Sequence, residues 1–155
     1  MRVIVFSDSH GNTDGMKRAL ERERAELIIH LGDVSADASY VAQLFSKPLI
    51  SVAGNCDMFP NVPYVTVTEI DGVYVYICHG HTLYDDEREV AREAKANGCS
   101  LAFFGHTHVP TDTVIDGVRV INPGSISRPR RPATLKTYAL GDVSTKGIKM
   151  NICEL

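Results

Sequence analysis

Hydrophobic and polar positions along the first third of the chain alternate between two patterns. The apolar runs at residues 2–6, 26–31 and 48–53 are short and bounded by turn residues, which is typical of buried strands. Between them, residues 12–25 and 36–45 place small and apolar side chains at helical spacing among polar ones. This alternation predicts an α/β arrangement with a largely parallel sheet.

The pattern changes in the second part of the chain, where two Asp-Gly dipeptides are each flanked by strand-like segments. Asp71-Gly72 and Asp116-Gly117 stand between alternating apolar residues, which is a strong signal for a β-hairpin. We also expect a third helix and several further strands. The expected strands of the hairpins are residues 64–70 with 73–79 and 111–115 with 118–122, the helix is 85–98, a strand covers 100–104, and 134–140 and 147–153 form a terminal meander.

Composition and charge narrow the class of protein. The chain has 155 residues, so we expect one domain over residues 1–155, with two packed sheets and outer helices. A net charge of -3 gives no basic footprint for nucleic acid, and no stable nucleic-acid binding is expected. The apolar runs are too short for a signal peptide or a bilayer span, so we expect a cytoplasmic protein without a membrane partner.

The four cysteines do not form a recognisable metal or disulfide pattern. Cys78, Cys99 and Cys153 are expected to be core thiols, because no C-x-x-C spacing occurs. Cys56 differs, since it lies in the polar segment "GNCD".

Groups able to bind a metal recur after the predicted strands. A single Asp or His in that position is usually a turn residue, but repetition after five segments indicates a site at the carboxyl ends of the strands. His30 lies inside a predicted strand and is expected to be a core or supporting histidine. The recurring groups are Asp8 and His10, Asp33, Asn55 and Asp57, His79 and His81, and His106 and His108.

The ordered motifs D-x-H, G-D, G-N-x-D, H and G-H-x-H resemble those of the calcineurin-like metallophosphoesterases over almost the whole chain. The short length, "GNCD" and "NPGSISRPR" make the chain similar to the small bacterial and archaeal phosphodiesterases whose eukaryotic relative is the retromer subunit Vps29. The resemblance implies a four-layer α/β/β/α sandwich, with two mixed sheets flanked by helices.

The resemblance also implies two divalent ions that share Asp33. One ion would be held by Asp8, His10, Asp33 and His108, and the other by Asp33, Asn55, His79 and His106. The mixed nitrogen and oxygen donors suit a first-row ion, with Mn²⁺ the first choice and Ni²⁺, Fe²⁺, Zn²⁺ or Mg²⁺ as alternatives.

A charge count favours phosphate chemistry at such a site. Two divalent ions bring four positive charges, and Asp8 and Asp33 remove only two. A positive site attracts a phosphoester, and two metals roughly 3.5–4 Å apart lower the pKa of a bridging water and stabilise an in-line transition state.

One residue departs from the family pattern. Cys56 stands where many relatives have the histidine of G-N-H-[DE] that protonates the leaving group. A thiol with a pKa near 8.5 is a weak acid for this task, so we expect a preference for good leaving groups unless another residue acts. His81 is the candidate, with a purely supporting role as its alternative, and Asp57 is expected to orient its neighbours.

The segment "SRPRRP" brings three arginines close to the expected site. Arg128, Arg130 and Arg131 either lie on a solvated loop, or one of them binds a substrate phosphate. Asn122 and Ser125 are expected to brace the site, because nothing near Ser125 indicates an activated nucleophile.

The leading hypothesis is therefore a metal-dependent phosphodiesterase with a small phosphoester substrate. A phosphomonoesterase and a Vps29-like binding scaffold are the alternatives. An amidohydrolase or metallo-β-lactamase is disfavoured, because the first motif is Asp8-x-His10 and no H-x-H-x-D-H run occurs. A homodimer or homotetramer is a further expectation for this class.

Overall fold

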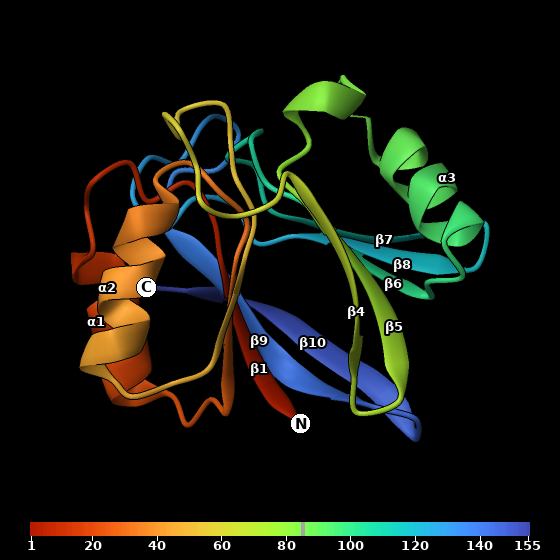
Figure 1. Ribbon diagram of the computed structural model, residues 1–155, viewed down its shortest axis with the longest axis horizontal. Coiled ribbons are helices and arrows are strands. Elements are labelled where there is room, and N and C mark those ends of the chain that lie inside the picture. Colours follow the sequence, from red (N-terminus) through yellow and green to blue (C-terminus); the bar gives the residue numbers. More distant parts are fainter. Residues whose placement is uncertain (85) are drawn as a thin grey trace.

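The computed structural model describes residues 1–84 and 86–155, and it places two five-stranded mixed sheets face to face between helices (Figure 1). The expected α/β sandwich is therefore confirmed. The helices α1 and α2 lie on one side in Figure 1 and α3 lies on the other, so the layers run helix, sheet, sheet, helix.

The first sheet has the strand order β10-β9-β1-β2-β3. β1, β2 and β3 are parallel, because helices make the connections between them, and β9 and β10 add to the edge as antiparallel strands. Its elements are β1 (Arg2–Phe6), α1 (Asp14–Arg22), β2 (Leu27–His30), α2 (Ser35–Leu44), β3 (Leu49–Ser51), β9 (Thr137–Ser144) and β10 (Gly147–Glu154).

The second sheet has the order β4-β5-β6-β8-β7 and contains both expected hairpins. β4 pairs with β5 and β7 pairs with β8 in antiparallel fashion, while β5, β6 and β8 run parallel to one another. Its elements are β4 (Val65–Ile70), β5 (Val73–Cys78), η1 (His81–Leu83), α3 (Glu87–Ala96), β6 (Leu101–Phe103), β7 (Thr111–Ile115) and β8 (Val118–Asn122).

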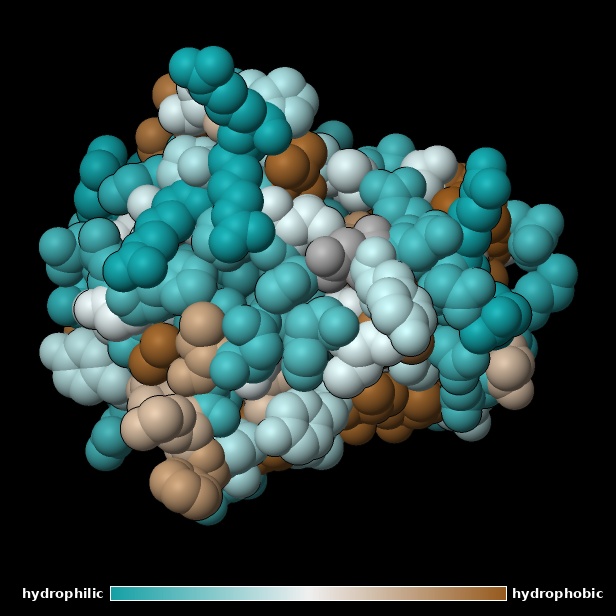
Figure 2. Space-filling view, turned by 90° about the horizontal axis from the view of Figure 1, so that it is seen from above, coloured by the Kyte–Doolittle hydropathy of each residue, from teal (hydrophilic) through white to brown (hydrophobic). Residues whose placement is uncertain are grey.

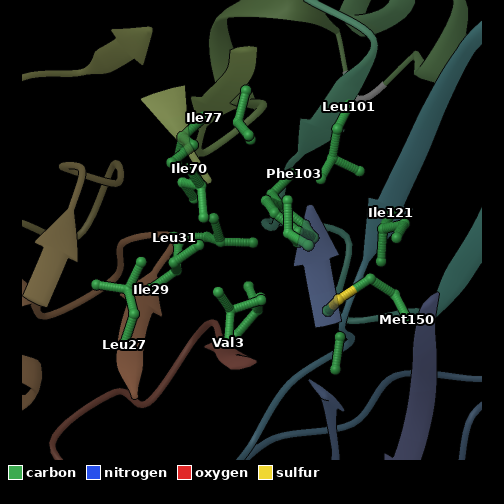
Figure 3. Close-up of a cluster of buried hydrophobic side chains, with 14 of the residues drawn as sticks. Val3, Leu27, Ile29, Leu31, Ile70, Ile77, Leu101, Phe103, Ile121 and Met150 are labelled. Atoms are coloured by element: carbon green, nitrogen blue, oxygen red, sulfur yellow. The ribbon is translucent and has the colours of Figure 1, made fainter. Parts of the chain in front are cut away.

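The main core lies between the two sheets, where side chains of both inner faces meet (Figure 3). Val3, Ile29 and Leu31 from the first sheet pack against Phe103 and Ile121 from the second. Two smaller apolar clusters join the outer faces of the sheets to their helices. Burial on both faces fixes the register of the central strands, which in turn fixes where their carboxyl ends lie.

Most predicted boundaries differ from the observed ones by a few residues. The helix expected over residues 12–25 is the shorter α1, and the helix expected over 85–98 begins at Glu87, with Asp85 outside the described residues. The strand predicted to end at residue 140 continues as β9 to Ser144. A Cβ at position 141 would lie 1.9 Å from the Lys149 carbonyl oxygen on β10. Glycine at this position therefore allows β9 and β10 to stay paired through residue 141.

Among the described residues, no helix has the length and apolar character needed to cross a bilayer.

Candidate metal centre

The expected donors come together where several strands of both sheets end. Asp8 and His10 follow β1, Asp33 follows β2 and Asn55 lies beyond β3. His79 follows β5, and His106 and His108 follow β6. Because these strands are parallel within each sheet, their carboxyl ends meet at the loop end of the molecule, at the top of Figure 1.

The donors form two groups that share one carboxylate. In each group, one ligand atom per residue lies within 4.8 Å of all the others, and Asp33 belongs to both groups. Asn55 extends the second group, since its Oδ1 lies 3.1 Å from His79 Nε2. The groups are Asp8, His10, Asp33 and His108, and Asp33, His79 and His106.

A hydrogen bond to Nδ1 of His79 determines which nitrogen of the ring can bind a metal. Nδ1 donates to the Leu31 carbonyl oxygen at 2.7 Å, so in the neutral ring Nε2 carries the lone pair. That nitrogen faces Asp33 Oδ1 at 3.3 Å and Asn55 Oδ1 at 3.1 Å. Lone pairs that converge in this way fit a bound cation.

His108 is oriented by the same device. Its Nδ1 donates to the Arg128 carbonyl oxygen, so Nε2 of the neutral ring is free to act as a metal ligand. This Nε2 lies 3.2 Å from His10 Nε2 and 3.1 Å from Asp8 Oδ1. Among the described residues, the buried Asp8 Oδ1 has no hydrogen-bond partner by geometric criteria. A buried carboxylate oxygen without a donor fits a metal ligand.

Both carboxylates remain ionised despite their burial. Burial by itself raises the pKa of Asp8, but His108, His79 and the hydroxyl of Ser7 outweigh it and lower that pKa. The pKa of Asp33 is also lowered, because contacts with His79 and the Cys56 amide outweigh its burial. In the protein without a metal, burial opposes protonation of His79, and the two aspartates nevertheless raise its pKa. A proton and a metal therefore compete for that ring.

Five of the donors adopt a left-handed backbone, with φ between 48° and 67°. Each such residue stores of the order of 1–3 kcal/mol of conformational strain, although Asp, Asn and His tolerate this region better than most residues. Such strain persists only where the surrounding structure holds the residue in place, and it is common at functional sites. The residues are Asp8, His10, Asp33, His106 and His108.

Asp57 links the backbone of two neighbouring loops. Its carboxylate accepts hydrogen bonds from the amides of Asp33, Ser35 and Gly54 at 3.0, 2.6 and 2.8 Å. The Asp57 carboxylate thus holds the backbone of Asp33. Burial raises the pKa of Asp57, but these hydrogen bonds outweigh it and lower that pKa.

Other polar residues brace the loops that carry Asp8 and His106. Ser125 and Ser127 both donate from their hydroxyls to the Asp8 carbonyl oxygen, and Asn122 donates to the Gly105 carbonyl oxygen. Ser7, Ser127 and Asp37 were not singled out from the sequence. Asp37 accepts from the Ser9 hydroxyl and the Gly11 amide beside His10, but an acid in the first turn of a helix gives no sequence signal for such a role.

The two candidate acids each neighbour a residue of the second donor group. His81 is half-buried on η1, and its ring centroid lies 5.3 Å from that of His79. Cys56 is exposed and its amide donates to Asp33 Oδ1 at 2.9 Å. Burial and the neighbouring Asp33 raise the pKa of the Cys56 thiol, so it is protonated at neutral pH.

The arginine loop contacts the centre through its main chain. Arg128, Arg130 and Arg131 are all exposed, and the Arg128 carbonyl holds His108. The pKa of His10 is lowered, chiefly by burial, with a smaller contribution from the positive charge of Arg128. The positive charge of Arg128 therefore acts on the donor His10.

Fold and donor set together define a metal-binding α/β sandwich. The chain belongs to the calcineurin-like phosphoesterase superfamily, whose domain model matches residues 1–146.

Relatives and solved structures agree with this assignment. A probable metallophosphoesterase of Mycoplasma pneumoniae is 31% identical over 142 residues, covering 88% of this chain and 86% of the relative. The phosphodiesterase YfcE of Escherichia coli K12 is 28% identical over 156 residues, covering 84% and 82%.

Among solved structures, a predicted phosphoesterase from Streptococcus pneumoniae TIGR4 superimposes with a TM-score of 0.84 at 25% identity, covering 99% of this chain and 88% of the other. Vps29 of Entamoeba histolytica in complex with zinc superimposes with a TM-score of 0.77, covering 99% of both chains, and its 17% identity shows a common fold alone.

Proposed function

We propose that this protein is a divalent-metal-dependent phosphodiesterase with a two-metal centre. The observation that carries the proposal is the pair of donor groups that share Asp33, in each of which one ligand atom per residue lies within 4.8 Å of all the others. Asp8, His10, Asp33 and His108 would hold one ion, and Asp33, Asn55, His79 and His106 the other. Mn²⁺ is the first candidate, and Fe²⁺, Ni²⁺, Zn²⁺ and Mg²⁺ are alternatives.

When bound, two such ions would stabilise negative charge on a phosphoryl group and would lower the pKa of a nearby water. The protein's own residues set the geometry. Leu31 and the Arg128 carbonyl fix the two ring tautomers, and Asp57 fixes the backbone of Asp33. The leaving oxygen also needs a proton, and we assign this role to His81, whose ring centroid lies 5.3 Å from that of His79.

A diester suits the charges of the site better than a monoester. A monoester carries two negative charges and calls for several added cations around its free oxygens. Here the three arginines of the segment 127–132 are exposed, although the charge of Arg128 acts on the donor His10. The name phosphodiesterase given to the relative YfcE supports the same choice.

Calorimetric Mn²⁺ titration of metal-stripped protein, combined with turnover of bis-p-nitrophenyl phosphate, tests this proposal. Two ions should bind per chain. Asp33→Asn should weaken both sites, His79→Ala should weaken one, and both variants should lose turnover while keeping their circular-dichroism spectra. Asp142→Asn changes an exposed carboxylate on β9 that pairs with Arg2, and should change neither property.

Retained turnover in both ligand variants would overturn the proposal. Binding of two ions without turnover of any phosphoester would instead favour a Vps29-like scaffold, in which the centre shapes a binding surface.

A further inference from the structure

A groove of about 350 Å³ lies beside the metal centre and has no role in the function proposed so far. One wall is the start of α2 and the residue before it, and the other is the segment 56–62 that follows the donor Asn55. We call it the side groove. Its lining residues are Val34, Ser35, Ala36, Ser39, Cys56, Asp57, Met58, Phe59, Pro60, Asn61 and Val62.

Both walls of the side groove are tied to Asp33. Asp57, on one wall, accepts hydrogen bonds from the amides of Asp33 and of Ser35 on the other wall. The Cys56 amide donates to Asp33 Oδ1 at 2.9 Å. A group held in the groove therefore contacts residues that position the carboxylate shared by both donor groups.

The side groove is suited to an uncharged group. All of its lining residues belong to the described part of the chain, and they include no lysine or arginine. Its one carboxylate, Asp57, has its oxygens occupied by backbone amides, and one of these is the Ser35 amide in the first turn of α2. The start of that helix is thus already capped by an anion, which disfavours a second phosphate there.

Apolar side chains with strained backbones stand on both walls. Phe59 has 94% of its surface exposed and Met58 has 85%. Phe59 (φ 53°) and Val34 (φ 76°) are left-handed, which is unfavourable for a bulky or β-branched residue. Viewed from the loop end, the surface is mainly hydrophilic and apolar side chains gather along the lower margin of Figure 2. Exposed aromatic faces held in strained conformations are typical of ligand-binding sites.

We propose that the side groove binds the ester group that stays on the phosphate after hydrolysis, and that this group is neutral, ring-bearing and about the size of a nucleoside. The inference rests on the proposed phosphodiesterase function and names its substrate class. A diester has such a second group, whereas a monoester has none to fill the groove. Phe59 stacks on the ring, and the α2 wall limits its size.

Two substrates with the same leaving group test the proposal on the Mn²⁺-loaded protein. They are the p-nitrophenyl diester of thymidine monophosphate and methyl p-nitrophenyl phosphate. In each, water adds to phosphorus, p-nitrophenolate leaves, and thymidine or methyl remains on the phosphate. The measured quantity is the ratio of kcat/KM for the thymidine ester to kcat/KM for the methyl ester.

Phe59→Ala should lower this ratio about tenfold, through KM, since stacking of a base on an aromatic side chain contributes roughly this much to binding. Ser39→Trp places a bulky side chain on the α2 wall and should lower the ratio at least as far. Tyr74→Ala is the matched control. It removes an exposed aromatic side chain at the end of β5 remote from His79, and should leave the ratio unchanged.

The outcomes separate the two proposals. If neither ester is hydrolysed, the phosphodiesterase function fails. If both are hydrolysed and Phe59→Ala and Ser39→Trp leave the ratio unchanged, the function stands and the side groove is not the binding site. An equal loss on both substrates would also overturn the inference, because it would place the leaving group in the groove.

Discussion

Replacement of Asp57 by Ala tests whether the carboxylate behind Asp33 positions the metal donors. The change removes an acceptor that three backbone amides share, at 2.6 to 3.0 Å. Hydrogen bonds to a charged group contribute about 1.5–3 kcal/mol each when buried, but water replaces part of this at a half-buried site, so we take ~1 kcal/mol for each. The free energy of unfolding should fall by about 3 kcal/mol, which corresponds to a decrease in Tm of roughly 6–12 °C for a chain of this size.

The same variant should bind Mn²⁺ at least ten times more weakly, because the Asp33 backbone loses its fixed position. Thermal unfolding without metal and calorimetric titration with Mn²⁺ measure the two effects separately. Asp86→Ala is the matched control, since Asp86 also accepts a backbone amide, that of Arg88 at the start of α3. It should lose about 1 kcal/mol, as for other capping residues, and keep its metal affinity.

The pH dependence of unfolding gives a further check on the same carboxylate. The pKa of Asp57 is lower in the folded protein than in the unfolded chain, so its stabilisation is present above the unfolded pKa, near 3.9, and is lost as pH falls through the folded pKa. Asp57→Ala should therefore lose less stability than the wild type on acidification below about pH 4. Unchanged stability and unchanged Mn²⁺ affinity in Asp57→Ala would refute the reasoning.

Three further predictions concern other parts of the centre. Gly54→Ala should weaken Mn²⁺ binding at least tenfold in calorimetry, because the added Cβ would lie 2.2 Å from Asp33 Oδ1 and displace that carboxylate. Wild-type affinity in this variant would contradict the prediction. Burial lowers the pKa of His30 to about 4, so the unfolded chain takes up a proton at higher pH than the folded protein does. As pH falls from about 6.5 to 4, His30→Leu should therefore lose less stability than the wild type. An equal loss of unfolding free energy in both proteins would contradict this. Mn²⁺ at a hundred times its Kd should stabilise metal-free protein by about 2.7 kcal/mol for each ion bound, so two ions should raise Tm by roughly 10–20 °C. An unchanged Tm would argue against a metal site.

Local sequence signals predicted much of the architecture. Asp71-Gly72 and Asp116-Gly117 marked both hairpins, because few dipeptides other than Asp-Gly and Asn-Gly suit such tight turns. The continuation of β9 was missed, since Gly141 and Asp142 resemble a turn in sequence. Only the close approach of β10 explains a glycine inside that strand.

The donors were predictable as a set because each follows a strand, and parallel strands bring their carboxyl ends together. Their fine geometry was not, since it depends on contacts between residues far apart in the chain. The Leu31 carbonyl that sets the His79 tautomer is 48 residues away, and the Ser125 hydroxyl that braces Asp8 is 117 residues away. Neither hydrophobic periodicity nor a local motif predicts hydrogen bonds between residues so far apart in the sequence.

The most direct test of the central claim is hydrolysis of bis-p-nitrophenyl phosphate beside p-nitrophenyl phosphate. Metal-stripped protein would be assayed alone and after reconstitution with Mn²⁺, Ni²⁺, Zn²⁺ or Mg²⁺. The account predicts turnover that requires metal and favours the diester. Absence of turnover of either ester with any ion, while two ions are bound per chain, would contradict it.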